Sequence, residues 1–228
     1  MGIRLSIVIP VWNNFNFTKS VLKWFRGRDE FEIIVVNNGS TDETKVGLIN
    51  LQESMNNLVS IHNDNNLGFG AAVNMGITKA SADHVLILNN DIMIGSKNDD
   101  WLLTLISDKN ELVGPTGGFL DENLNFKYET ETENINDKIN YMSGWCLCAN
   151  KKVWDSLIIP GCSGPFDNKT FFCYFEDTDL SFRASRANIK FKMVKIPVYH
   201  IGKQTSKNLN ISKLFTESKE KFLKKWKG

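Results

Sequence analysis

The chain has 228 residues, of which 42% are hydrophobic and 23% are charged, and its formal net charge is +1. This length suffices for one large domain with a buried core. The nearly neutral charge argues against a general nucleic-acid-binding protein, because such domains carry a strongly basic face. No apolar run reaches the roughly 18 residues of a membrane-spanning helix, so we expect no such helix.

The first part of the chain alternates between two kinds of segment. Short apolar runs predict buried strands at 5–11, 32–37, 59–63 and 84–89. The segments between them predict helices at 16–26, 41–57 and 70–80, the first capped by Asn16 or Thr18 and the second by Ser40 or Thr41. Continuous apolar strands that alternate with helices indicate a parallel sheet covered on both faces.

Polar residues follow three of these strands, and ligands of parallel sheets bind beyond the carboxyl ends of the strands. The polar segments are Pro10 to Asn14, Asn37 to Asp42, and Asn89 to Asp91. Burying such amides and acids is costly unless each finds a partner. We therefore expect the three segments to border one crevice that holds a polar ligand.

The second part of the chain is less regular. The acidic segment 121–138 predicts an exposed excursion, and 139–157 predicts a strand followed by a short helix. The segment 171–189 begins aromatic and becomes an amphipathic helix, and 189–200 alternates like a strand that ends at His200. The tail 211–228 predicts a basic amphipathic helix, whose lysines form either a solvated face, which we favour, or a contact with an anionic membrane surface.

The cysteines are few and irregularly spaced for a disulfide framework: Cys146, Cys148, Cys162 and Cys173. A zinc site is disfavoured because no CxxC pair or nearby histidine supports it. We interpret the cysteines as reduced thiols, which predicts a cytoplasmic protein.

Two groups of residues carry candidate chemistry. Asp91 and His200 each end a strand-like segment, and a carboxylate with an imidazole suits manganese, although a turn cap and a surface histidine explain each residue singly. Glu176, Asp177 and Asp179 follow the aromatic run FFCYF. Acids there cap a helix N-terminus, but an aromatic, partly dry setting also raises a carboxyl pKa toward use as a general base.

Several segments, in this order, resemble a family 2 glycosyltransferase of the GT-A fold: LSIVIPVWNN, EIIVVNNGSTDET, NDNNLGFGAAVNMGI, HVLILNNDIMI, MSGWCLCANKKVWDSL, PFDNKTFFCYFEDTDLSFRASRANIKF and VYHIGKQTS. The Asn-Asn-Asp form and YFEDTDLSFR look most like the rhamnosyltransferase-like branch. The resemblance implies an α/β fold with a mixed central sheet covered by helices. It divides the chain into one domain, 1–210, with a nucleotide-binding half (1–95) and an acceptor and catalytic half (96–210), followed by the helix 211–228.

The resemblance further implies an inverting transfer of a sugar from a UDP- or dTDP-sugar to a hydroxyl of a glycan, polysaccharide or lipid-linked sugar. Asp91 and His200 would bind Mn²⁺ or Mg²⁺, and Asn89 would meet the ribose. Asp177 would be the general base, and Glu176, the second catalytic acid, would bind the acceptor or orient the site. Asp179 is interpreted as structural, in a helical ion pair with Arg183.

By the same resemblance, the nucleotide would contact Pro10, Val11, Asn13, Asn37, Asn38, Asn66, Gly68, Asn74, Asn89, Asn90 and Asp91. The chain departs from the family at Asn37 and Asn38, where an aspartate commonly hydrogen-bonds to the nucleobase. Gly68 is equally explained by a turn that needs positive φ. Gly144 and Trp145 would line the acceptor side, with Trp145 either stacking on a sugar or buried in the core.

Two other functions remain alternatives. The asparagines at 37, 38, 89 and 90 are also expected of a nucleotide- or sugar-binding module that has lost catalysis. The segment GFGAAV imitates a dinucleotide-binding fingerprint, which would indicate an NAD-dependent oxidoreductase, but Val73 replaces its third glycine.

Overall fold

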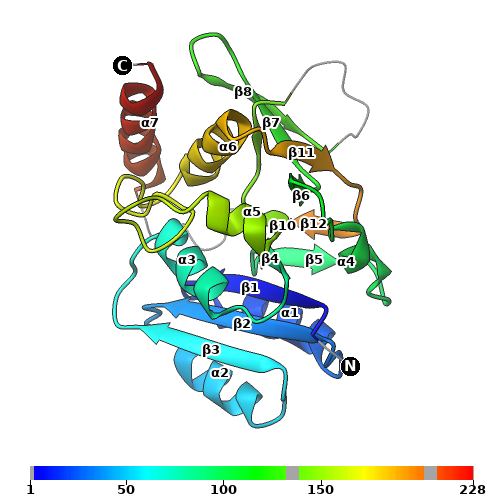
Figure 1. Cartoon of the computed structure of the whole chain (residues 1–228). Coiled ribbons are helices and arrows are strands. Elements are labelled where there is room, and N and C mark those ends of the chain that lie inside the picture. Colours follow the sequence, from blue (N-terminus) through cyan, green and yellow to red (C-terminus); the bar gives the residue numbers. More distant parts are fainter. Residues whose placement is uncertain (1–2, 132–138, 203–209, 228) are drawn as a thin grey trace.

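The computed structural model describes residues 3–131, 139–202 and 210–227, and its centre is a seven-stranded sheet in the order β11-β6-β10-β4-β1-β2-β3 (Figure 1). The strands are β1 (Leu5–Val11), β2 (Phe31–Asn38), β3 (Leu58–Asn63), β4 (His84–Leu88), β6 (Glu111–Gly114), β10 (Cys146–Asn150) and β11 (Lys190–Met193). β1 to β4 run parallel, whereas β10 is antiparallel to both β4 and β6. The predicted mixed sheet is confirmed.

Helices cover both faces of this sheet (Figure 1): α1 (Phe15–Phe25), α2 (Thr44–Gln52), α3 (Phe69–Lys79), α4 (Asp100–Thr104), α5 (Lys151–Ser156) and α6 (Glu176–Arg186). Ile7 and Ile9 of β1 belong to the core cluster that contains Leu22 of α1. Val8 between them belongs to the cluster on the other face, with Val73 of α3. Because both faces are buried, the strands need apolar residues at every position, which explains their unbroken apolar runs.

Two small antiparallel sheets extend this frame. β5 (Ile92–Ile94) pairs with β12 (Val198–His200), which places His200 opposite Ile92, directly after Asp91. β7 (Gly117–Leu120) pairs with β8 (Phe126–Thr130) and with β9 (Tyr141–Met142). In Figure 1, the β7–β8 hairpin projects from the sheet on the side of α6 and α7.

The predicted C-terminal helix is present as α7 (Ile211–Lys227). Phe222 is fully buried against Phe175 and Phe182, and Lys225 Nζ lies 2.7 Å from carboxylate oxygens of both Asp167 and Asp179. One of its lysines is therefore ion-paired with acids of the domain, although the residue as a whole remains exposed. Among the helices of the described ranges, none combines the length and the apolar character that crossing a bilayer requires.

The predicted helix caps are wrong. α1 begins at Phe15, so Asn16 and Thr18 lie inside it, and its N-cap is Asn14, a left-handed residue with φ of 58°. α2 begins at Thr44, beyond Ser40 and Thr41, and the Oδ1 atom of Asp42 accepts a hydrogen bond from the Thr44 N–H. Like the predicted caps, Asp42 offers a side-chain oxygen as a hydrogen-bond acceptor, but it lies closer to the first residue of α2.

Two strand predictions also change. The alternating segment 189–200 forms two strands, β11 and β12, which belong to different sheets. The excursion predicted at 121–138 contains β8, and its residues 132–138 lie outside the described part of the chain. Cys146 and Cys148 are buried free thiols of β10, as predicted, and burial raises the pKa of both.

Candidate active site

The carboxyl ends of β1, β2 and β4 border one cleft, as the position of the polar segments predicts. About 620 Å³ of empty space lies within it. The predicted nucleotide-binding residues that line it are Pro10, Val11, Asn38, Asn66, Gly68, Asn89, Asn90 and Asp91. Trp12 of the predicted segment Pro10 to Asn14 also lines it, as do Phe69, Phe172 and Cys173, which sequence reasoning missed. We call this space the donor cleft, after the sugar-nucleotide donor that the resemblance leads us to expect there.

Asp91 and His200, which are 109 positions apart in the chain, meet beside the donor cleft. His200 Nε2 lies 3.1 Å from Asp91 Oδ1 and 3.3 Å from Asn89 Nδ2. The pairing of β5 with β12 produces this meeting, because it places His200 next to the segment that follows Asp91. The predicted convergence of the two residues is therefore present.

Trp145 holds the imidazole of His200 in place. The two rings stack with centroids 5.0 Å apart and an interplanar angle of 7°. Trp145 is 5% exposed, and its Nε1 donates a 3.0 Å hydrogen bond to Thr116 Oγ1. Because one face of the indole is covered by His200 and the rest is buried, stacking on an acceptor sugar does not fit this residue.

The donor set beside the cleft suits a hard or borderline divalent cation. It comprises a carboxylate and an imidazole, and the amide of Asn89 lies beside His200, with its buried Oδ1 atom without a hydrogen-bond partner. The residues described by the structure contain no group of three or more His, Cys, Asp or Glu side chains that could hold a metal ion. A metal here would thus depend on ligand oxygens as well as on Asp91 and His200.

Asn13 and Asn37 do not line the donor cleft, and their side chains form hydrogen bonds with the segments around it. Asn37 Oδ1 accepts from the Ser40 N–H at 3.0 Å, and its Nδ2 lies 3.1 Å from His62 Nδ1. Asn13 Oδ1 accepts from the Thr41 N–H at 2.8 Å. The Asn13 bond ties the loop after β1 to the loop after β2, whereas the Asn37 bonds fix the loop after β2 and reach β3.

Asn74 is also a structural residue. It is fully buried in α3, and its amide exchanges two 2.9 Å hydrogen bonds with the backbone of Phe166. It therefore fixes the segment before α6 to α3 and does not reach the donor cleft.

Asn38 reaches the donor cleft, although internal bonds use most of its amide. Nδ2 donates to Asn66 Oδ1 and to the Gly68 carbonyl, and Oδ1 accepts from Asn63 and from the Leu67 N–H. Gly68 has φ of 89°, and a Cβ there would lie 2.5 Å from the carbonyl oxygen of Phe172. Both the conformation and the close approach require glycine.

The dinucleotide-binding alternative does not fit this geometry. A fingerprint glycine loop leaves the first amides of the following helix free for a pyrophosphate. Here the Phe69 N–H at the start of α3 donates to the Phe172 carbonyl at 3.1 Å. Backbone of the chain itself occupies the place that a dinucleotide phosphate would need.

Asp177 is held by backbone amides at the start of α6. Its Oδ2 accepts from the Gly144 N–H at 2.9 Å, and its Oδ1 accepts from the Thr178 N–H at 2.7 Å. A Cβ on Gly144 would lie 3.1 Å from the Cβ of Asp177, so a larger residue here would require Asp177 to shift by a few tenths of an ångström. Gly144 lines neither this cleft nor the acceptor-side cavity described below.

The two neighbouring acids have different surroundings. Glu176 is 7% exposed and its Oε2 has no hydrogen-bond partner. Burial, followed by the charge of Asp177, raises the pKa of Glu176 to about 8. Burial also raises the pKa of Asp177, but the amides of Gly144 and Thr178 oppose that rise. We assign the shared proton to Glu176, which leaves Asp177 as the carboxylate.

Left-handed backbone sets the direction of these acids. Tyr174 and Phe175 have φ of 70° and 66°, and Phe175 is the N-cap of α6. Consecutive non-glycine residues in this region are strained, and such strain persists only where packing enforces it. The ring of Phe175 packs on Phe222 of α7, which provides that packing. Asp179, one turn into α6, forms the predicted ion pair with Arg183 at 2.9 Å.

A second hollow lies on the other side of Asp177, with about 1120 Å³ of empty space. It is bordered by β8, the start of α6 and α7, and we call it the acceptor-side cavity. Glu176 and Asp177 line it, together with Glu129 of β8, which sequence reasoning missed. Partial burial and then the charge of Asp177 raise the pKa of Glu129, while His200 lowers it, so Glu129 lies within electrostatic range of both residues.

A chain of direct contacts links the two hollows. Asp177 accepts a hydrogen bond from the Gly144 N–H, and the residue that follows Gly144 is Trp145. Trp145 stacks on His200, and His200 contacts Asp91. The predicted base and the predicted metal-binding residues are thus held in one unit, on the two sides of the loop 143–145.

The family model for glycosyl transferase family 2 matches residues 6–155, more than half of the chain. EpsH of Bacillus subtilis (strain 168), named a putative glycosyltransferase, is 24% identical over 206 residues, which cover 86% of this chain and 60% of that protein.

Solved structures share the fold. The mannosyltransferase PcManGT from Pyrobaculum calidifontis, in complex with GDP-Man and Mn²⁺, matches 90% of this chain and 59% of that chain, with a TM-score of 0.63 and 15% identity. S. aureus TarS in complex with UDP matches 86% of this chain and 60% of that chain, with a TM-score of 0.63 and 19% identity. The chain therefore spans about 60% of the length of these proteins. It belongs to glycosyltransferase family 2 and has the GT-A fold.

Proposed function

We propose that the chain catalyses the inverting transfer of a sugar from a nucleoside diphosphate sugar to an acceptor hydroxyl, with Asp177 as the general base. The observation that carries this proposal is the contact chain from Asp177 through Gly144 and Trp145 to His200 and Asp91. A base must face the acceptor while the leaving diphosphate is held on the donor side, and this chain spans both sides. A binding module without catalysis would not need such a link.

Asp91 and His200 would hold Mn²⁺ or Mg²⁺, with Asn89 Oδ1 as a further oxygen beside them. When bound, the cation supplies positive charge that stabilises the departing diphosphate. The residues of the chain do the remaining work. The stacked Trp145 orients His200, and the amides of Gly144 and Thr178 keep Asp177 ionised so that it can take the proton of the acceptor hydroxyl.

A UDP- or dTDP-sugar is the proposed donor. TarS binds UDP and PcManGT binds GDP-Man, so the panel below includes a guanosine compound. Because the Asn-Asn-Asp segment resembles that of rhamnosyltransferases, the panel also includes dTDP-rhamnose. Asn37 and Asn38 are neutral, and their amides are largely hydrogen-bonded to neighbouring loops. We therefore propose the backbone of Pro10 and Val11 as the contact for the nucleobase.

The proposed acceptor is a glycan or a lipid-linked sugar. Peripheral contact of α7 with a membrane would use its outward lysines, since Lys225 is engaged with Asp167 and Asp179.

The test is a thermal-shift panel of sugar nucleotides with and without Mn²⁺, followed by donor hydrolysis with the best binder. We expect the largest shift with a uridine or thymidine compound plus metal, and slow release of the diphosphate. Asp177→Asn should reduce that release about 10²- to 10⁴-fold and leave the thermal shift unchanged. Asp155→Asn, on an exposed position of α5, is the matched control. Tight nucleotide binding without turnover in any condition would favour the binding module.

A further inference from the structure

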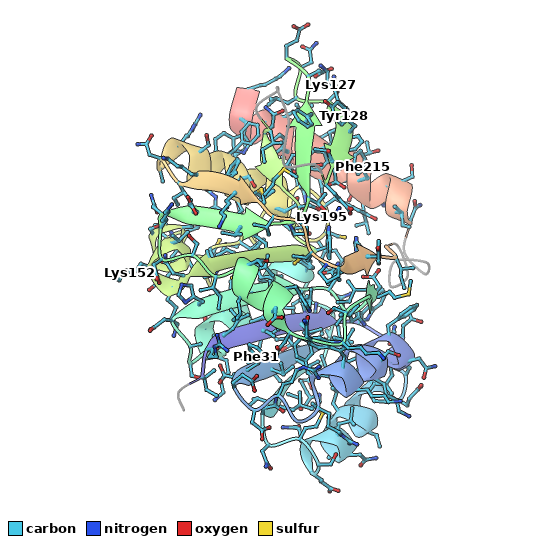
Figure 2. The ribbon with its side chains drawn as sticks, turned by 90° about the vertical axis from the view of Figure 1, so that its right-hand side faces the viewer. Phe31, Lys127, Tyr128, Lys152, Lys195 and Phe215 are labelled. Carbon is cyan, nitrogen blue, oxygen red and sulfur yellow. The ribbon has the colours of Figure 1, made fainter. Side chains whose placement is uncertain are left out.

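The acceptor-side cavity has a distinctive composition. Aromatic rings reach it from several separate elements, including Phe126 of β8, Phe175 at the start of α6 and Phe215 of α7. Phe215 packs against Phe175, with ring centroids 5.2 Å apart. Figure 2 labels Phe215 on α7, below the outer part of the hairpin that carries Lys127 and Tyr128. Apolar ring faces of this kind suit the C–H faces of a pyranose ring.

The ionisable side chains that line the acceptor-side cavity are all acids. Glu129 and Asp177 line it as carboxylates and Glu176 lines it with its proton, and no lysine, arginine or histidine does so among the residues that the structure describes. An anion placed there would face like charge without a compensating cation, which disfavours its binding. A sugar hydroxyl, in contrast, is a hydrogen-bond donor, and a carboxylate accepts such bonds well.

Glu129 is the acid best placed for a specificity role. Tyr141 donates to its Oε1 at 3.1 Å, which orients the carboxylate, and the Ser143 hydroxyl lies near enough to lower its pKa. A carboxylate offers about four acceptor positions, which leaves capacity for a ligand. The residue itself remains exposed along β8, so a ligand can reach it.

We propose that the acceptor-side cavity binds an uncharged sugar unit of the acceptor and that Glu129 both hydrogen-bonds its hydroxyls and excludes units that carry a carboxylate or phosphate. This inference rests on the proposed function, because it concerns the acceptor of the same reaction. Aromatic faces would give affinity without selectivity for charge, whereas Glu129 would give the selectivity.

The experiment measures binding of matched glycoside pairs by saturation-transfer NMR to the full chain, with UDP and Mn²⁺ present. The pairs are methyl glucoside with methyl glucuronide, and methyl galactoside with methyl galacturonide. We expect at least one neutral member to bind about tenfold more tightly than its charged counterpart. Glu129→Gln should remove most of that ratio, because the amide keeps the hydrogen-bonding shape but not the charge. Glu122→Gln, an exposed acid in the turn of the same hairpin, should leave the ratio unchanged.

Equal or tighter binding of the charged members, no binding of any neutral member, or a ratio that survives Glu129→Gln would overturn the inference. The thermal shift with UDP and Mn²⁺ is recorded on the same samples. A UDP shift without glycoside selectivity refutes the role of Glu129 alone, whereas the absence of any nucleotide shift refutes the proposed function.

Discussion

The backbone N–H of Gly144 donates a 2.9 Å hydrogen bond to Oδ2 of Asp177, and the position of the glycine allows no larger residue without movement. A Cβ on Gly144 would lie 3.1 Å from Asp177 Cβ and 3.5 Å from Asp177 Oδ2. These separations make the loop 143–145 the element that sets both the position and the charge of the proposed base.

Gly144→Ala should therefore lower the rate of transfer more than it lowers donor binding. The new methyl group displaces the carboxyl of Asp177 by a few tenths of an ångström. It thereby weakens the hydrogen bond from the Gly144 N–H that keeps the carboxyl ionised. We expect kcat to fall about tenfold, since larger misplacements of a reacting group cost about a hundredfold. Steady-state kinetics at saturating donor, with UDP binding measured in parallel, checks this. An unchanged kcat would show that the base tolerates displacement.

Glu176 should make stability depend on pH in a direction that its burial fixes. Its pKa rises from 4.5 to about 8 on folding, so the folded chain keeps a proton that the unfolded chain loses above pH 4.5. Stability from this group therefore declines as pH rises from 4.5 toward 8, by up to about 1.4 kcal/mol per pH unit. Below pH 4.5 both the folded and the unfolded chain hold the proton, so stability no longer changes with pH through this group.

Glu176→Gln removes that titration. The variant should gain stability relative to the unmodified chain as pH increases from 5 to 8, with the two curves closest in acid. Urea unfolding at several pH values measures the difference. A difference that is constant with pH would mean that Glu176 is ionised in the folded protein at all these pH values.

His200→Ala should separate nucleotide binding from its stimulation by metal. In the proposal, His200 and Asp91 hold the cation, and Trp145 only orients the histidine. We expect the Mn²⁺-dependent part of the UDP thermal shift to be lost, with a decrease in metal affinity of about 10- to 100-fold or more, while the metal-free UDP shift is retained. Trp145→Phe keeps a stacking ring and should retain most of the metal effect. Full Mn²⁺ stimulation in His200→Ala would remove the histidine from the metal site.

The donor side of the site was predictable from local pattern. Asn38, Asn89 and Asp91 each follow a parallel strand, and the carboxyl ends of such strands meet at one edge. The positions of Asp91 and His200 at the ends of strand-like segments suggested that they could converge, and the resemblance to a family added a shared metal. The pairing of β5 with β12 that produces the contact was not available from pattern, because it joins two short strands far apart in the chain.

The acceptor side shows where sequence reasoning fails. Glu129 lies in an acidic segment whose composition is typical of a loop, and only the fold of the β7–β8 hairpin brings it to Asp177. Trp145 could have been a sugar platform or a core residue until its stacking on His200 decided the question. Asn13 and Asn37 have the residue type of ligand contacts, but neighbouring loops use their hydrogen-bonding groups. Tertiary partners, not residue types, determine such roles.

Lys225 should contribute more to stability than any outward lysine of α7. Its Nζ lies 2.7 Å from Asp167 and 2.7 Å from the fully buried Asp179. Burial alone raises the pKa of Asp167, but hydrogen bonds, that from Lys225 first among them, bring it below its ordinary value. Lys225→Met should therefore destabilise the chain by about 1–3 kcal/mol at neutral pH, because it leaves buried carboxylate oxygens with fewer partners.

The pH dependence and a matched variant make this prediction specific. A carboxyl whose pKa is lowered on folding stabilises the protein above its unfolded pKa and loses that contribution as pH falls through the folded value. The cost of Lys225→Met should accordingly shrink in acid, because protonated Asp167 no longer needs a cation. Lys221→Met, on an exposed position of the same helix, should change stability by less than about 0.5 kcal/mol at any pH. Equal effects of the two variants in urea unfolding would mean that burial of Phe222 and Trp226, and not the ion pairs, fixes α7 to the domain.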